Sequence, residues 1–96
     1  MTYSVYRVTH KDKVIYIGYS CSLNRRFKEH NYHLKKGTKK ELYDYLRTKK
    51  VSVIVLESLR EFKTKTEAKR FEIMLILMYH FGGHRTLNKI PSISDR

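Results

Sequence analysis

The segment that most constrains the fold is a long apolar stretch with a helix start signal before it and a helix stop signal after it. Thr64 is followed three residues later by Glu67, the spacing of a capping box, and Gly82-Gly83 marks the end. Apart from Glu72, the residues from Phe71 to Met78 are apolar on nearly all sides of such a helix. The pattern predicts a central helix that is buried on several sides.

Glu72 is the exception in this apolar segment. Its helical neighbours at −4, +3 and +4 are Ala68, Leu75 and Ile76. An unpaired carboxylate is costly in such surroundings. Two interpretations are open: Glu72 pairs with a basic residue for structural reasons, or it serves a functional site.

The beginning of the chain predicts a β-hairpin. Residues 3–8 and 14–17 are rich in β-branched and aromatic side chains, and the polar stretch 10–12 separates them. A three-residue loop would place Tyr6 directly opposite Tyr16. Both phenols would then lie on one face of the sheet.

Two helices are expected after the hairpin. Gly18 is expected to end the second strand, and Ser22 to cap a helix that stops near Gly37. One face of that helix would carry Leu23, Phe27, His30 and Leu34. The next helix would run from Glu41 to about Lys49 and turn Leu42, Tyr45 and Leu46 inward.

A third strand is expected at residues 51–56, where valines alternate with Ser52 and Ile54. The tail from His84 to Arg96 is expected to be irregular and partly docked. The whole predicts an α+β fold, with a small three-stranded sheet flanked by helices. A length of 96 residues fits a single domain, 1–96.

The charge of the chain favours a polyanionic partner. The sequence has 21 Lys and Arg residues against 9 Asp and Glu residues, a formal charge of +12. Basic residues are concentrated between Arg25 and Lys50. Such a surface attracts nucleic acid through its phosphates, although a solvated surface is the simpler reading of any single lysine run.

Other classes of protein fit poorly. No apolar run approaches the roughly 20 residues of a membrane span, and the start does not resemble a signal peptide. We therefore expect a cytoplasmic protein that does not bind membranes. Cys21 is the single cysteine, and neither a C-x-x-C nor an HExxH spacing occurs.

The order of several residues resembles that of the GIY-YIG nuclease family. The matching positions are Ser4-Val5-Tyr6, Tyr16-Ile17-Gly18, Ser20, Leu23, Arg26, His30, Glu72 and Asn88. Residues 16–30 meet the pattern Y-I-G-x-S-x-x-L-x-x-R-x-x-x-H in full, and the first motif reads SVY in place of GIY. The resemblance covers essentially the whole chain.

The resemblance implies a metal-dependent DNA endonuclease that leaves 5′-phosphate and 3′-hydroxyl ends. Glu72 would hold one Mg²⁺ or Mn²⁺ ion, largely with water and phosphate oxygens. Tyr6 would help activate the attacking water, for which its pKa should lie below about 10. Arg26 would bind the scissile phosphate. Tyr16 and His30 would orient water and phosphate or move protons, and their acid and base roles stay open.

Further positions would contact the substrate. Gly18 would let the backbone turn without a Cβ beside the substrate, and Asn88 would bind phosphate or brace the site. Ser20, Arg25 and Lys28 would add polar and basic contacts. The long DNA-binding extension of the family's homing enzymes is not present in these residues, so we expect low specificity or recognition of DNA shape, such as branches. A partner protein or a second copy could supply targeting, in a phage or mobile-element setting.

Two other functions compete with the nuclease. A catalytically inactive nucleic-acid-binding module of the same fold would keep the basic face. A basic structural or ribosome-associated protein would explain the charge but not Glu72. The residues do not separate DNA from RNA as the substrate.

Overall fold

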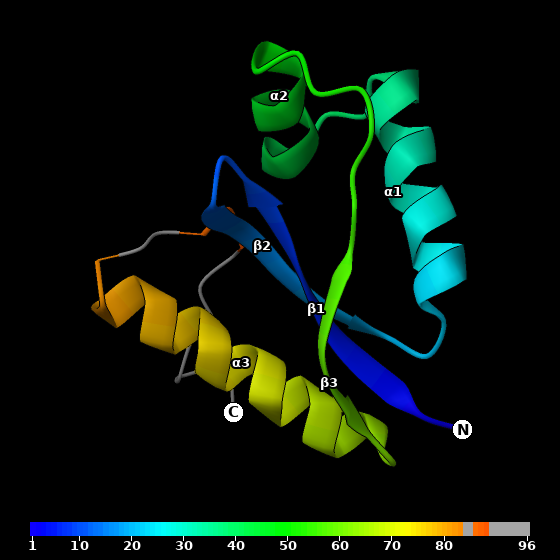
Figure 1. The fold of residues 1–96 in the computed structure, drawn as a ribbon, viewed down its shortest axis with the longest axis vertical. Coiled ribbons are helices and arrows are strands. Elements are labelled where there is room, and N and C mark those ends of the chain that lie inside the picture. The colour runs from blue at the N-terminus through cyan, green and yellow to red at the C-terminus, as the bar shows by residue number, and fades with distance from the viewer. Residues whose placement is uncertain (84–85, 89–96) are drawn as a thin grey trace.

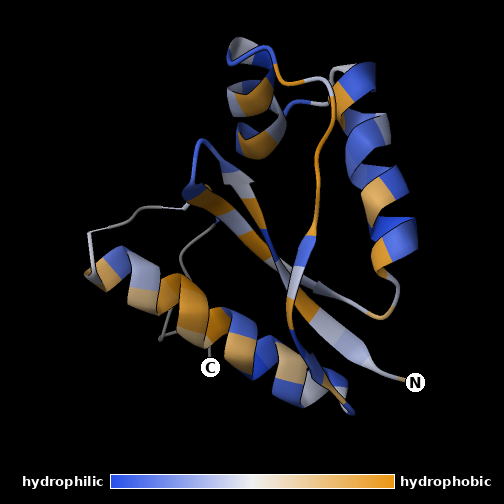
Figure 2. Ribbon diagram, in the orientation of Figure 1, coloured by the Kyte–Doolittle hydropathy of each residue, from blue (hydrophilic) through white to orange (hydrophobic). Residues whose placement is uncertain are grey.

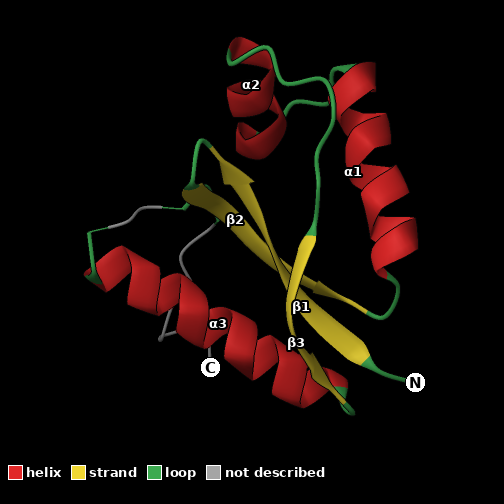
Figure 3. Cartoon of the chain, in the orientation of Figure 1, coloured by secondary structure: helices red, strands yellow, loops and turns green. Residues whose placement is uncertain are grey.

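The computed structural model describes residues 1–83 and 86–88. The elements in chain order are β1 (Tyr3–His10), β2 (Lys13–Ser20), α1 (Leu23–Lys36), α2 (Glu41–Thr48), β3 (Glu57–Phe62) and α3 (Lys65–Phe81). The strands form one antiparallel sheet in the order β2-β1-β3. The helices α1 and α2 lie on one side of the sheet and α3 on the other (Figures 1 and 3). This α+β arrangement confirms the predicted fold class.

The hairpin is present, but its predicted register is wrong. Lys11 and Asp12 form a two-residue turn with φ values of 51° and 63°, and His10 pairs with Lys13. Two positive φ angles match the twist of a hairpin better than the expected three-residue loop. The second strand also continues past Gly18 to Ser20.

A β-bulge in the hairpin places Tyr6 and Tyr16 on the same face of the sheet. The register shifts between Val8 and Thr9, so Ile15 is the extra residue, and Tyr6 pairs with Gly18 instead of Tyr16. Tyr6 and Tyr16 are nevertheless neighbours, with ring centroids 6.5 Å apart. The prediction that both phenols share one face is therefore confirmed, although they are not a directly opposed pair.

Helix α1 begins and ends where its caps predict. The Ser22 hydroxyl accepts a hydrogen bond from the Arg25 backbone N–H, and Gly37 ends the helix at a φ of 87°. His30 and Leu34 are buried. Phe27 is 37% exposed, so the predicted apolar stripe is narrower than expected. In α2 the buried residues are Leu42, Tyr43 and Leu46, and Tyr45 lies at the border.

The third strand lies later in the chain than predicted. Residues 51–56 form no strand, and Val53 and Val55 are exposed, whereas Glu57–Phe62 pairs with β1. The side chain of Asn31 takes both backbone groups of Ile54: its Oδ1 accepts from the Ile54 N–H at 2.7 Å, and its Nδ2 donates to the Ile54 carbonyl at 3.0 Å. The valine-rich run thus packs Ile54 against α1 without joining the sheet.

Helix α3 has the predicted bounds but not the predicted burial. The Thr64 hydroxyl accepts from the Glu67 N–H, which confirms Thr64 as the N-cap, and it also donates to the Glu67 carboxylate. Ala68 and Ile76 are buried, whereas Met74 and Met78 are exposed. Figure 2 shows the second half of this helix as its most hydrophobic part. It therefore covers one face of the sheet instead of forming a centre buried on several sides, and no helix in the described ranges is long and apolar enough to span a bilayer.

The described part of the tail docks on β2, as predicted. The Leu87 N–H donates to the Ile15 carbonyl at 2.7 Å. The rest of the predicted irregular tail, residues 84–85 and 89–96, lies outside the described residues.

Two buried clusters lie on the two faces of the sheet. The cluster beneath α1 and α2 contains Tyr6, Val8, Ile15, Leu34, Leu42, Tyr43, Leu46 and Ile54. The cluster beneath α3 contains Val5, Ile17, Ala68 and Ile76. The cluster beneath α1 and α2 therefore contains two buried tyrosines, whereas the buried residues of the cluster beneath α3 include none.

Candidate active site

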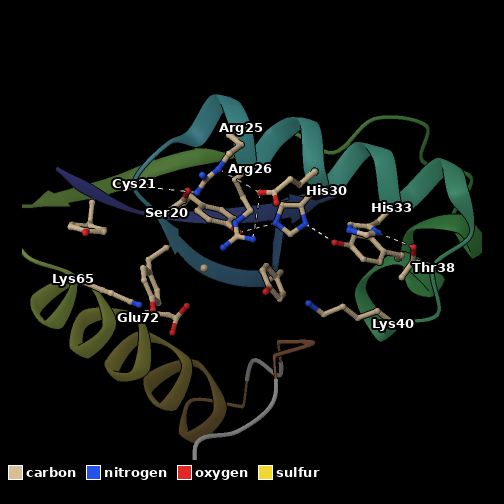
Figure 4. A pocket seen from close by; sticks show the side chains of 17 residues that line it. Ser20, Cys21, Arg25, Arg26, His30, His33, Thr38, Lys40, Lys65 and Glu72 are labelled. Atoms are coloured by element: carbon tan, nitrogen blue, oxygen red, sulfur yellow. Dashed lines mark hydrogen bonds and ion pairs between the residues drawn. The ribbon is translucent and has the colours of Figure 1, made fainter. Parts of the chain in front are cut away.

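A pocket of about 680 Å³ lies where β2 meets the helices α1 and α3 (Figure 4). Eight of the predicted site residues line it: Tyr6, Tyr16, Gly18, Ser20, Arg25, Arg26, His30 and Glu72. They come from β1, β2, α1 and α3. The fold thus brings into one place residues that are scattered along the chain.

A chain of hydrogen bonds passes through His30. The hydroxyl of Tyr6 lies 2.8 Å from Nε2 of His30, and the hydroxyl of Tyr43 lies 2.9 Å from Nδ1. Burial, with a smaller contribution from the nearby charges of Arg26 and Lys40, lowers the pKa of His30 to about 4. His30 is therefore neutral at pH 7, with one nitrogen that donates and one that accepts.

The protonation of Tyr6 differs from the expectation. Tyr6 is 1% exposed, and this burial raises its pKa well above 10, with a further contribution from Tyr16. Burial also raises the pKa of Tyr16. The expected lowered pKa is therefore wrong for the protein by itself, because desolvation outweighs the favourable charge of Arg26.

Arg26 presents its charge to the pocket from α1. Its Nη1 lies 3.7 Å from the Glu29 carboxylate, a long ion pair between half-exposed side chains. Its Nε is buried and has no hydrogen-bond partner among the described residues. A buried donor without a partner is costly, so this guanidinium is well suited to bind an anion.

Glu72 reaches the pocket from α3. No hydrogen bond or ion pair joins its carboxylate to another residue of the described ranges. Burial raises the pKa of Glu72 to about 7, even though the charges of Lys69 and Arg26 lower it. Figure 4 shows the Glu72 carboxylate and the Arg26 guanidinium approaching the pocket from opposite helices.

These surroundings suit a hard divalent cation at Glu72. A cation would compensate the desolvated carboxylate, which has no hydrogen-bond or ion-pair partner in residues 1–83 and 86–88. The described residues contain no group of three or more acidic, His or Cys side chains that could hold a metal. One carboxylate beside an open pocket fits Mg²⁺ or Mn²⁺, because Mg²⁺ keeps several waters and is often shared with substrate phosphates.

Gly18 has a different role from the one expected. A Cβ at this position would lie 2.5 Å from the Tyr6 hydroxyl and 2.6 Å from Cζ of the same ring. The absence of a Cβ at Gly18 therefore makes room for the ring of Tyr6 on the neighbouring strand β1. It does not serve a backbone turn beside the substrate, as the sequence had suggested.

Of the four other residues predicted to contact the substrate, two line the pocket and two do not. Ser20 lines the pocket, but its hydroxyl donates to the Ser22 carbonyl and accepts from the Ser22 N–H, so it shapes the turn into α1. Asn88 lies outside the pocket lining: its amide accepts from the Ile17 N–H and donates to the Ile17 carbonyl, which braces β2. Lys28 is exposed on α1 and does not line the pocket, whereas Arg25 does.

Several lining residues were not predicted. Tyr43 lies on α2, and Lys40 precedes that helix with its ammonium 5.4 Å from the Tyr16 ring centroid. His33, Thr38 and Lys65 also line the pocket. A wider inward face on α2 would have included Tyr43, which lies next to Leu42. Nothing in the local sequence separates Lys40 from its basic neighbours.

One comparison with known proteins identifies the family of the chain. Residues 2–86 match the family model described as the GIY-YIG catalytic domain. Searches of curated proteins and of solved structures found no significant match. Ser4, which replaces the glycine of the first motif, does not line the pocket. The match covers most of the chain and includes every predicted catalytic residue, so the chain belongs to the GIY-YIG family of nucleases.

Proposed function

We propose that the protein is a metal-dependent endonuclease that hydrolyses DNA and leaves 5′-phosphate and 3′-hydroxyl ends. The observation that carries this proposal is the pair of charges in one pocket, the Glu72 carboxylate and the Arg26 guanidinium. A cation beside Glu72 and a phosphate beside Arg26 would each satisfy a group that has no close partner among the residues described in the structure.

In the proposed reaction, Tyr6 and His30 move a proton. The attacking water gives its proton to the Tyr6 hydroxyl while that hydroxyl passes its own proton to Nε2 of His30, 2.8 Å away. Because the two transfers are concerted, the buried phenol never carries a full negative charge. The raised pKa of Tyr6 is then compatible with its role.

Arg26 and Glu72 act on the phosphate. As the water oxygen bonds to phosphorus and the bond to the 3′ oxygen breaks, Arg26 donates to a non-bridging oxygen that gains negative charge. The leaving 3′ oxygen takes a proton from solvent. Glu72 would hold a divalent ion, which would supply positive charge at the phosphate.

The basic surface supports binding to the nucleic acid backbone. Arg25 and Lys40 line the pocket, and Lys28 and Lys36 are exposed elsewhere on α1. Contacts of this kind are independent of sequence. The proposal therefore includes low sequence specificity, with duplex or branched DNA as the substrate.

Cleavage of supercoiled plasmid tests the proposal. We expect nicking with Mg²⁺ or Mn²⁺, none with EDTA, and resealing of the nick by a DNA ligase, which requires 5′-phosphate and 3′-hydroxyl ends. Glu72→Gln and Arg26→Ala should each lower the rate at least about 100-fold. Glu61→Gln, an exposed carboxylate on β3, is the matched control and should keep the wild-type rate.

The same variants distinguish the nuclease from a nucleic-acid-binding module without catalytic activity. If neither plasmid, branched DNA nor RNA is cleaved, while all variants retain salt-sensitive DNA binding, the chain is a binding module and the proposal is wrong. If RNA alone is cleaved, the substrate class is wrong but the site is not.

A further inference from the structure

Tyr43 is the buried titratable group of the pocket that the proposed steps do not use. Its side chain is 4% exposed, and its hydroxyl lies 2.9 Å from Nδ1 of His30, opposite the nitrogen that faces Tyr6. Tyr43 comes from α2, an element that contributes none of the matched motif residues.

The Tyr43 ring is held on more than one side. His33 stacks on it with centroids 5.7 Å apart and an interplanar angle of 29°, and the Nδ1 of His33 lies 2.9 Å from the Thr38 hydroxyl. The Arg47 guanidinium donates to the carbonyls of Leu34 and Thr38, which ties α2 to the end of α1. The Tyr43 hydroxyl is therefore fixed relative to His30.

The hydrogen bond at Nδ1 decides what Nε2 can do. A neutral imidazole has one N–H and one acceptor nitrogen. If Nδ1 carries the proton and donates to Tyr43, Nε2 is free to accept the proton of Tyr6. If Nε2 carries the proton, it can only donate to Tyr6, and the transfer required for water activation is blocked.

We propose that Tyr43 is a positioning residue that accepts a hydrogen bond from Nδ1 of His30 and so holds His30 in the tautomer whose Nε2 receives the proton of Tyr6. This inference rests on the proposed function for its catalytic consequence. The tautomer itself can be measured without catalysis.

The structure supplies a matched pair of variants. Tyr43→Phe removes the hydroxyl and keeps the ring that stacks on His33. Tyr45→Phe removes a hydroxyl from the same helix, where the ring contacts His10, outside the pocket lining. Both variants preserve the aromatic packing, and thermal unfolding checks that each remains folded.

Nitrogen NMR of the full chain with ¹⁵N-labelled histidine reads the tautomer at pH 7, with the His30 signals assigned by their loss in His30→Gln. We expect protonated Nδ1 and unprotonated Nε2 in the wild type and in Tyr45→Phe. In Tyr43→Phe the proton should shift toward Nε2, where the Tyr6 hydroxyl can accept it. Protonated Nε2 in the wild type, or an unchanged His30 spectrum in Tyr43→Phe, would overturn the proposal.

Plasmid cleavage then tests the consequence of the tautomer. Tyr43→Phe should lower kcat about tenfold or more with KM changed less than twofold, and Tyr45→Phe should change neither. An unchanged kcat together with the expected NMR shift would overturn the catalytic part. If no variant and no wild type cleaves, the proposed function fails, and the NMR result alone still decides whether Tyr43 sets the tautomer.

Discussion

The two faces of the sheet place neighbouring residues in different kinds of environment. Val5 and Tyr6 are adjacent in β1, yet Val5 packs with Ile17 and Ile76 beneath α3, whereas Tyr6 lies beneath α1 and bonds to His30. Alternation along a strand separates the two side chains. On the face covered by α3, the buried cluster consists of apolar side chains that pack the helix on the sheet. On the face covered by α1 and α2, the apolar core also contains buried polar groups. The comparison teaches that the hydrogen-bonded pair of Tyr6 and His30 in the candidate site belongs to the core on one face only.

Truncation of a core leucine should have the largest effect on stability. Leu46, 1% exposed beneath α2, should lose about 3 kcal/mol of unfolding free energy when changed to Ala, because the substitution leaves a cavity. Met78→Ala on α3, where the side chain is 60% exposed, should cost less than about 0.5 kcal/mol. Urea unfolding of the two variants measures the contrast, and equal losses would contradict it.

The polar face should also make stability depend on pH. The folded-state pKa of His30, about 4, lies below the ordinary value of 6.5, so the unfolded chain takes up a proton as the pH falls through 6.5 and the folded chain does not. Stability should therefore be fully present above pH 6.5 and decline toward pH 4, by up to about 3 kcal/mol. An NMR titration of His30 with a midpoint near 6.5 would refute this prediction.

Substitution of Gly18 should damage the polar face specifically. Gly18→Ala places a Cβ against the rigid Tyr6 ring, so we expect a loss of about 2 kcal/mol and of most cleavage activity. In a Tyr6→Leu background the clash is relieved, and the same substitution should cost much less stability. A double-mutant cycle by urea unfolding tests this coupling, and additive effects would show that the Tyr6 ring is not what excludes the Cβ.

The smallest expected effect belongs to the cap of α3. Thr64→Ala removes the acceptor of the Glu67 N–H and should cost about 1 kcal/mol. Cleavage at 25 °C should stay within twofold of wild type, because Thr64 itself does not line the pocket. A large loss of activity with little change in stability would mean that the start of α3 positions Glu72 more directly than the packing indicates.

The sequence predicted the helix bounds correctly where they depend on interactions between residues close together in the chain. The bounds of α1 and α3 follow from Ser22, Gly37 and the Thr64 capping box, which act within a few residues. The third strand was misplaced because the Asn31 side chain, distant in sequence, binds the backbone of Ile54. No local pattern reveals such a partner.

The part of the candidate site that could be predicted is the set of residues that match the spacing of a sequence motif. Arg26, His30 and Glu72 were found from the motif pattern and lie together in the pocket. The bulge at Ile15, the obstruction of Gly18 by the Tyr6 ring and the approach of Tyr43 to His30 all depend on how distant elements pack. Sequence spacing contains no direct information on these contacts.

The central position of β1 divides the folding reaction into a fast step and a slow step. Pairing of β1 with β2 needs only a two-residue turn, and hairpins form in about 1–10 μs. Pairing of Tyr3 with Phe62 must close a loop that holds both α1 and α2, which is a slower, non-local event. Tyr6 and Tyr16 can therefore meet early, whereas Glu72 joins them only after β3 and α3 have docked. The candidate site is therefore complete only in a late stage of folding.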